Sequence, residues 1–172
     1  MQKRICLIAP SGYGKTTAIK LISKNFKIKN IKIAEPLYNL QFHFYQTIGK
    51  TMNGEQDGEL LQFFGAKIRK ENPIFLLNEF KKQIDKFNNC DVIITNDDCR
   101  PPDYDYLKKL GFVFVEIKGF SHTRQDHSKI DKKNSLEWQS EIKCDFCVEN
   151  TSTLKQYEQN LIHLISKIIK SK

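Results

Sequence analysis

The sequence has no long apolar run and little arginine. The first shortage excludes a membrane-spanning helix, and the second makes each arginine a candidate for a specific role. No stretch approaches the roughly 20 apolar residues that a membrane-spanning helix needs, and the longest apolar runs have the length of a strand. The opening residues, MQKRICLIAP, are too short to form a secretion signal. We therefore expect a cytoplasmic protein without a membrane partner.

Arginine is scarce, because only four of the 28 Lys and Arg residues are arginine. A net charge of +8 built mainly from lysine is typical of solvated surface, and it would also attract anionic ligands. Arginine is the side chain suited to bidentate contacts with phosphate. In a chain with so few, Arg69, Arg100 and Arg124 become candidates for holding a phosphate group, whereas Arg4 flanks the first expected strand and is assigned no role.

The cysteines are odd in number and scattered, which argues against a disulfide framework. Five cysteines lie among apolar neighbours in a chain without an export signal, so reduced thiols are the simplest interpretation. Cys144 and Cys147 form one CxxC pair, but a zinc site would need two more ligands at suitable spacing, and none is convincing.

Length and patterning together predict one α/β domain over residues 1–172. Short apolar runs alternate with longer amphipathic ones, which indicates a three-layer α/β/α fold with a mainly parallel sheet of about five strands. From about 119 to 143 the periodicity disappears, and this segment is either a solvated loop or a lid that closes over a site. The expected strands are 4–9, 31–34, 91–95, 112–117 and 146–149, and the expected helices are 15–24, 37–48, 59–69, 73–87, 104–110 and 154–168.

The octapeptide APSGYGKT, from Ala9 to Thr16, has the spacing of a phosphate-binding P-loop, with Ala in place of the first Gly. Gly12 and Gly14 permit the backbone conformations that turn N–H groups toward an anion, and the start of the following helix adds positive charge. Lys15 would bridge the β- and γ-phosphates of ATP, and the Thr16 hydroxyl would ligate Mg²⁺. The residues predicted to bind the nucleotide are Ser11, Gly12, Tyr13, Gly14, Lys15, Thr16 and Thr17.

Two acids follow the apolar strand expected at 91–95. Asp97 and Asp98 are either an ordinary strand-ending turn or the acid that holds the magnesium shell, partly through water. We expect the magnesium role for Asp98, with Arg100 two residues on as a catalytic cation. A small kinase also needs a pocket for its acceptor and an element that excludes water. The aromatic helix with Phe42 and the segment with Arg124 are candidates for these.

Four short segments besides the P-loop follow one another in a characteristic order. They are 33–38 (IAEPLY), 59–65 (ELLQFFG) with Arg69, 98–103 (DCRPPD) with 107–111 (LKKLG), and 149–154 (ENTSTL). Their order resembles that of the phage-type deoxynucleoside monophosphate kinases, small members of the P-loop kinase superfamily. The chain departs from the family's pattern at Tyr38, where a basic residue is common, and at Tyr104, where a second acid is expected and Asp103 or Asp105 is the candidate substitute.

The resemblance implies transfer of the ATP γ-phosphate to a nucleoside monophosphate, with a deoxy form favoured. Region 35–88 would then bind the acceptor, with Glu35 on its sugar or base, Phe42 against the base, and Arg69 and Arg100 on its phosphate. The catalytic residues would be Lys15, Asp98, Arg100 and Arg124. For the aromatic residues Phe42, Phe44 and Tyr45, burial in the core is an equal alternative.

Two other functions stay open at this stage. The same P-loop chemistry could act on a modified DNA base or on a small metabolite, or the chain could be a nucleotide-binding regulatory protein without turnover. Nucleic acid is disfavoured as a partner but stays an alternative, and the sequence does not decide whether the protein forms a homodimer.

Overall fold

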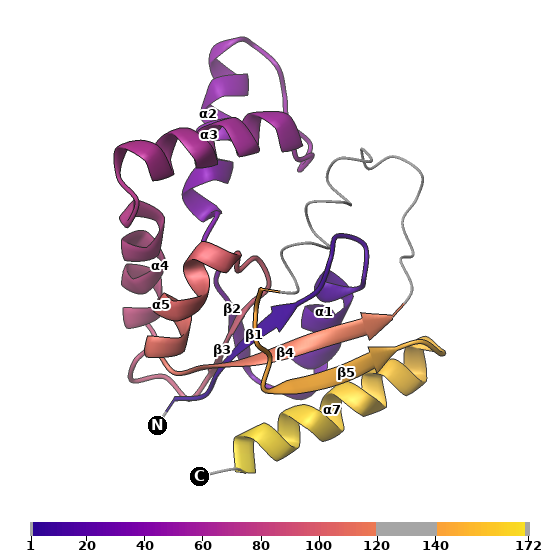
Figure 1. Ribbon diagram of the computed structural model, residues 1–172. Helices are drawn as coiled ribbons and strands as arrows, with labels where there is room; N and C mark the ends of the chain where they lie inside the picture. Colours follow the sequence, from indigo (N-terminus) through magenta and orange to yellow (C-terminus); the bar gives the residue numbers. More distant parts are fainter. Residues whose placement is uncertain (1, 120–140, 171–172) are drawn as a thin grey trace. The chain divides into compact units, whose positions relative to one another are not determined.

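A five-stranded parallel sheet is the framework of the first of two units in the chain. The structure is a computed structural model that describes residues 2–119 and 141–170. The first unit comprises the described residues up to Asn30 and from Asn89 on, and the second is Ile31–Asn88. The strands are β1 (Arg4–Ile8), β2 (Ile28–Asn30), β3 (Ile93–Asn96), β4 (Phe112–Gly119) and β5 (Phe146–Asn150), in the spatial order β2-β3-β1-β4-β5 (Figure 1).

One face of the sheet is covered by α1 (Lys15–Asn25) and α7 (Leu154–Lys170) (Figure 1). Alternate strand residues such as Ile5 and Val115 point to this face, because side chains along a strand alternate between its two sides. They pack against apolar residues that recur every three or four positions along α7, as a helix that buries one stripe requires. The buried stripe of α7 is Tyr157, Leu161, Leu164, Ile165 and Ile168.

The opposite face of the sheet carries η1 (Pro101–Asp103) and α5 (Tyr104–Lys109). Phe114 of β4 points to this side, and the ring of Tyr104 lies 4.7 Å from it between centroids. Leu107 on the same short helix is fully buried. With helices on both faces, the first unit has three layers, and the predicted α/β fold with a parallel sheet is confirmed.

The second unit is helical and consists of α2 (Glu35–Thr47), α3 (Gly58–Glu71) and α4 (Phe75–Asp85). The loop between α2 and α3 is held by Gln41, a buried side chain of α2. Its amide donates to the Glu55 carbonyl at 3.0 Å and accepts from the Asp57 N–H at 2.8 Å. The Asp57 carboxylate in turn accepts from the Leu60 N–H at 3.0 Å, so Asp57 caps the start of α3.

One expectation from the sequence is wrong, and one alternative that it left open is excluded. The second strand was expected at 31–34, but β2 ends at Asn30 and the following residues are not a strand. Ile31 and Ile33 are nevertheless buried, so the apolar pattern reported burial and not strand pairing. Burial in the core, the alternative left open for Phe42 and Phe44, is excluded because their exposed fractions are 52% and 43%. The expected lid at 119–143 lies mostly outside the described residues.

Candidate functional site

The loop between β1 and α1 has the backbone that the sequence predicts for a phosphate-binding loop. Gly12 has φ +83° and Gly14 has φ +93°, both in the left-handed region that side chains with a Cβ rarely adopt. The loop is closed by a bond from the Tyr13 N–H to the Pro10 carbonyl at 3.4 Å. The predicted nucleotide-binding residues 11–17 all lie on this loop or in the first turn of α1.

Positive charge gathers where this loop enters α1. No acidic residue occupies the first turn of the helix, so no carboxylate of that turn offsets the partial positive charge of the helix N-terminus. Lys15, the first residue of α1, is part-buried and donates from Nζ to the carbonyls of Ala9 and Pro10, the second at 3.0 Å. Its ammonium group is thereby kept on the loop. This arrangement suits an anion with several negatively charged oxygens, such as a polyphosphate.

An acidic turn lies at the same edge of the sheet, because β3 runs parallel to β1 and is hydrogen-bonded to it. Asn96, the last residue of β3, is fully buried and organises this turn. Its amide donates to the Asp98 carboxylate at 2.6 Å, and its Oδ1 accepts from the backbone N–H groups of Asp98 and Cys99 at 3.3 and 3.1 Å. Asp98 is thus held half-exposed beside the P-loop strand, with carboxylate oxygens of the kind that Mg²⁺ prefers.

Asp97 has a different environment from Asp98. Only 6% of it is exposed, and its carboxylate accepts from the Asn30 amide at 3.1 Å. The Thr95 hydroxyl donates to the Asn30 Oδ1 at 3.2 Å, so the end of β2 is tied to β3 by these polar contacts. Asp97 therefore joins two strands, whereas Asp98 keeps exposed surface at the carboxyl end of β3. Asn30 and Asn96 were not identified from the sequence.

The thiols near this edge are neutral donors. The Cys6 thiol of β1 is buried and donates to Asn96 Oδ1 at 3.4 Å. Burial and the neighbouring Cys99 raise the pKa of Cys6 well above its usual value, and burial raises the pKa of Cys144 to about 12. All five cysteines are free. Within residues 2–119 and 141–170, no three His, Cys, Asp or Glu side chains are grouped so that they could hold a metal ion.

Arg100 follows the acidic turn and is exposed. Its backbone N–H donates to the Asp103 carboxylate at 3.2 Å, and the Asp103 N–H donates back to the Arg100 carbonyl at 2.8 Å. Asp103 is fully buried, so it shapes the turn that presents Arg100. Tyr104 packs on the sheet and donates its hydroxyl to the Lys143 carbonyl at 3.1 Å, while Asp105 is exposed. Of the two candidate substitutes for the second acid, Asp103 is buried and hydrogen-bonded within this turn, whereas Asp105 is exposed.

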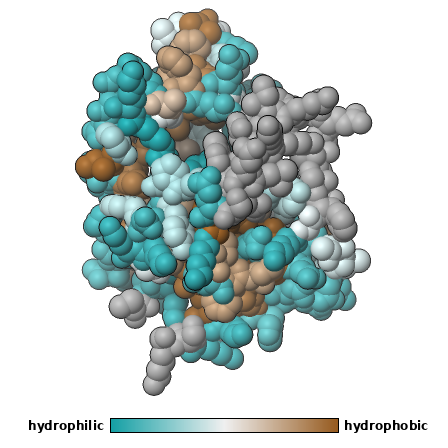
Figure 2. Space-filling view, in the orientation of Figure 1, coloured by the Kyte–Doolittle hydropathy of each residue, from teal (hydrophilic) through white to brown (hydrophobic). Residues whose placement is uncertain are grey.

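The residues predicted to bind the acceptor lie on the second unit. Glu35 is exposed at the first position of α2, Phe42 is exposed in the middle of that helix, and Arg69 is half-buried in the last turn of α3. Figure 2 shows apolar surface over α2. Their roles stay predictions, as does the role of Arg124, which lies outside the described residues.

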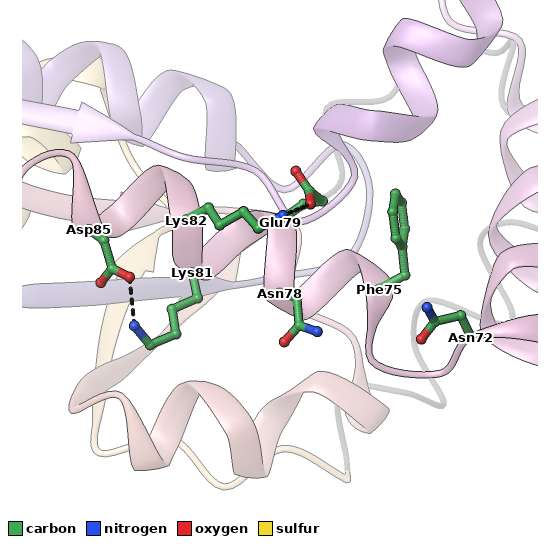
Figure 3. A pocket seen from close by; sticks show the side chains of 7 residues that line it. All are labelled: Asn72, Phe75, Asn78, Glu79, Lys81, Lys82 and Asp85. Atoms are coloured by element: carbon green, nitrogen blue, oxygen red, sulfur yellow. Dashed lines mark hydrogen bonds and ion pairs between the residues drawn. The ribbon is translucent and has the colours of Figure 1, made fainter.

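A hollow runs along α4 in the second unit, and Figure 3 shows the side chains that line it. Lys81 pairs with Asp85 at 2.6 Å, and Lys82 pairs with Glu79 at 2.6 Å. Such pairs at i, i+4 and i, i+3 on an exposed helix contribute about 0.3–0.5 kcal/mol each. We therefore interpret this hollow as a solvated helix face and not as a binding site. The lining residues are Asn72, Phe75, Asn78, Glu79, Lys81, Lys82 and Asp85.

The strand, glycine loop and helix, set in a parallel sheet with the order β2-β3-β1-β4-β5, define an α/β fold of the P-loop kinase type. Among the helices of the described residues, none is long and apolar enough to cross a membrane. No protein-family model and no curated protein matches the sequence.

Solved structures do match. A dephospho-CoA kinase from Campylobacter jejuni is 15% identical, with 97% of each chain covered and a TM-score of 0.56. A sugar kinase from Janibacter sp. HTCC2649 is 15% identical, with 98% of this chain and 95% of that chain covered and a TM-score of 0.56. Shikimate kinase from Bacteroides thetaiotaomicron is 13% identical, with 97% and 98% covered and a TM-score of 0.52. At these identities the likeness establishes the fold.

Proposed function

We propose that the protein is an ATP-dependent phosphotransferase whose acceptor is a nucleoside monophosphate. The observation that carries the proposal is the geometry at one edge of the sheet. There, Gly12 and Gly14 adopt left-handed backbone conformations in the loop, Lys15 begins α1, and Asp98 follows the neighbouring parallel strand. A regulatory nucleotide-binding protein would share the loop, the lysine and an acid for Mg²⁺, so the feature that favours phosphoryl transfer is the exposed Arg100 that follows the acidic turn.

The residues at this edge fit ATP with Mg²⁺. The N–H groups of the loop and the Lys15 ammonium would hold the phosphates, and the Thr16 hydroxyl with Asp98 would hold the metal and its water shell. Bound Mg²⁺ neutralises charge that develops on the transferred phosphoryl group. A phosphate oxygen of the acceptor is already nucleophilic, so the protein's task is to position the two substrates and to place cations such as Arg100 beside the reacting oxygens.

The choice of acceptor depends on the second unit. The resemblance to deoxynucleoside monophosphate kinases assigns Glu35, Phe42 and Arg69 to the acceptor. The exposed ring of Phe42 supports this assignment, because an aromatic ring that is not used in the core is available to pack on a base. The kinases of similar fold named above act on dephospho-CoA, a sugar and shikimate, and they make a small metabolite the second candidate class of acceptor.

A coupled assay of ADP release tests both parts of the proposal. ATP is supplied with the common ribo- and deoxynucleoside monophosphates, and in parallel with dephospho-CoA, shikimate and several sugars. We expect turnover with at least one monophosphate and none with the metabolites. Turnover with a metabolite alone would move the acceptor to the second class. Protein that binds ATP and releases no ADP with any acceptor would support a regulatory role instead.

The matched variants are Lys15→Ala and Lys20→Ala, both on α1. Removal of a cation that contacts the reacting phosphates lowers turnover by about 10²–10³-fold, by analogy with the loss of one oxyanion donor. Lys20 is exposed five residues further along the same helix, so its loss removes the same charge without touching the loop. Equal turnover of the two variants would contradict the assignment of Lys15.

A further inference from the structure

The end of β5 and the start of α7 contact the backbone of the P-loop. Asn150, the last residue of β5, is 8% exposed, and its amide donates to the Tyr13 carbonyl at 3.2 Å. Tyr157, in the first turn of α7, directs its hydroxyl to the Gly14 carbonyl at 3.5 Å. Two consecutive carbonyls of the loop are therefore contacted by side chains that lie more than 130 residues further along the chain. The Gly14 carbonyl also accepts from the Ala18 N–H of α1 at 2.8 Å.

These contacts orient N–H groups as well as carbonyls. A peptide unit is planar and trans, so its C=O and N–H point in opposite directions. The Tyr13 carbonyl belongs to the same peptide unit as the Gly14 N–H, and the Gly14 carbonyl belongs to the same unit as the Lys15 N–H. Asn150 holds the Tyr13 carbonyl, and Tyr157 together with the Ala18 N–H holds the Gly14 carbonyl, so both N–H groups are turned to the other side of the loop.

The packing around Asn150 leaves it little freedom. A Cβ added at Gly14 would lie 2.7 Å from the side-chain amide nitrogen of Asn150, and one added at Gly119 would lie 2.5 Å from the backbone carbonyl oxygen of Asn150. Asn150 is thus enclosed between the P-loop and the end of β4, where two glycines permit the approach. Tyr157 is 1% exposed, and burial raises its pKa, so its hydroxyl keeps the proton that it donates.

We infer that Asn150 and Tyr157 are positioning residues for phosphate binding, which hold the Gly14 and Lys15 N–H groups toward the anion. The inference rests on the proposed function, in which this loop binds the phosphates of ATP. Neither side chain needs to touch the nucleotide. Their contribution is to reduce the reorganisation that the loop would otherwise undergo when the anion binds.

Calorimetric binding of three probes separates this role from others. The probes are ADP with Mg²⁺, inorganic pyrophosphate with Mg²⁺, and adenosine, each titrated into the full chain. For Asn150→Ala we expect the affinities for ADP and for pyrophosphate to fall by the same factor, about five- to tenfold, which is what one lost hydrogen bond allows. Adenosine binding stays unchanged. The control is Asn25→Ala, which removes an amide bond of 3.2 Å to the Leu21 carbonyl at the other end of α1 and leaves all three affinities unchanged.

Other results would overturn the inference. A loss of ADP affinity without a loss of pyrophosphate affinity would mean that Asn150 contacts the base or the ribose. Unchanged binding of all three probes would remove Asn150 from the phosphate site while leaving the proposed function standing. Wild-type protein that binds neither ADP nor pyrophosphate would overturn the proposed function and this inference together.

Tyr157→Phe provides the second variant, since it keeps the ring in the core and removes only the hydroxyl. If Asn150→Ala fails to fold, as judged by thermal melting, Tyr157→Phe tests whether these side chains position the loop for phosphate binding. Because the Tyr157 bond is longer and the Gly14 carbonyl keeps its bond from the Ala18 N–H, we expect a smaller fall of about two- to fivefold, again equal for ADP and pyrophosphate. Equal binding by Tyr157→Phe and wild type would overturn the role of Tyr157.

Discussion

Gly14→Ala perturbs the P-loop in two ways that the structure allows us to separate. With φ +93°, Gly14 sits in the left-handed region, where a residue with a Cβ is less stable by about 1–2 kcal/mol. The added methyl group would also meet the Asn150 amide nitrogen at 2.7 Å and displace it from the Tyr13 carbonyl. Losing that hydrogen bond costs about 1 kcal/mol more. We therefore expect Gly14→Ala to lower the free energy of unfolding by about 2–3 kcal/mol.

Gly111→Ala is the matched control. Gly111 has φ +78°, so it meets the same backbone strain, but a Cβ there would have nothing within 4 Å. The gain from a less flexible unfolded chain is the same for both substitutions and cancels in the comparison. Urea unfolding followed by far-UV circular dichroism should therefore show a difference of about 1 kcal/mol between the two variants.

A double-mutant cycle isolates the cause of that difference. In an Asn150→Ala background the steric conflict at position 14 is gone, so Gly14→Ala should lose no more than Gly111→Ala. The reasoning is refuted if the two glycine variants are equally stable in the wild-type background, or if the excess loss at Gly14 persists when the Asn150 side chain has been removed.

Three further predictions concern the helix cap, the core and the acidic turn. Asp57→Ala should lower the free energy of unfolding by about 1 kcal/mol at pH 7. Bonds from the Leu60 N–H and the Tyr45 hydroxyl lower the pKa of Asp57 in the folded state. The stabilisation by Asp57 is therefore fully present at pH values above the ordinary pKa of 3.8, and it disappears as the pH falls through the lowered pKa. A stability difference between wild type and Asp57→Ala that persists in acid would contradict this prediction. Leu161→Ala, at a fully buried site, should lower the free energy of unfolding by about 2–5 kcal/mol. Leu154→Ala, at a site 60% exposed on the same helix, should lower it by less than about 1 kcal/mol. Similar losses of stability from both substitutions would refute the assignment of Leu161 to the core. Asp98→Asn should lower ADP release and weaken its dependence on Mg²⁺ concentration, while the exposed control Asp91→Asn leaves both unchanged.

Local patterns predicted the strand, loop and helix at the P-loop because their chemistry lies within adjacent residues. The glycines at positions 12 and 14 have the left-handed backbone that their place in the motif predicted. Leu154 is apolar but exposed, because it is the first residue of α7 and the buried stripe of that helix begins at Tyr157. Burial without strand pairing at Ile31 and Ile33 gave a misleading strand pattern, since apolar spacing reports burial and does not identify the hydrogen-bonding partner.

By itself, the sequence determined the fold class and the place of the phosphate-binding loop, because periodicity and the P-loop spacing depend on neighbours along the chain. Only the tertiary structure decided which acid is tied to the end of β2 and which one is presented beside the P-loop strand. It also brought Asn30 against Asp97, and Asn150 and Tyr157 against the loop. The physical reason is that a buried amide or hydroxyl must find a partner wherever the fold brings one near, and these partners come from distant strands and helices.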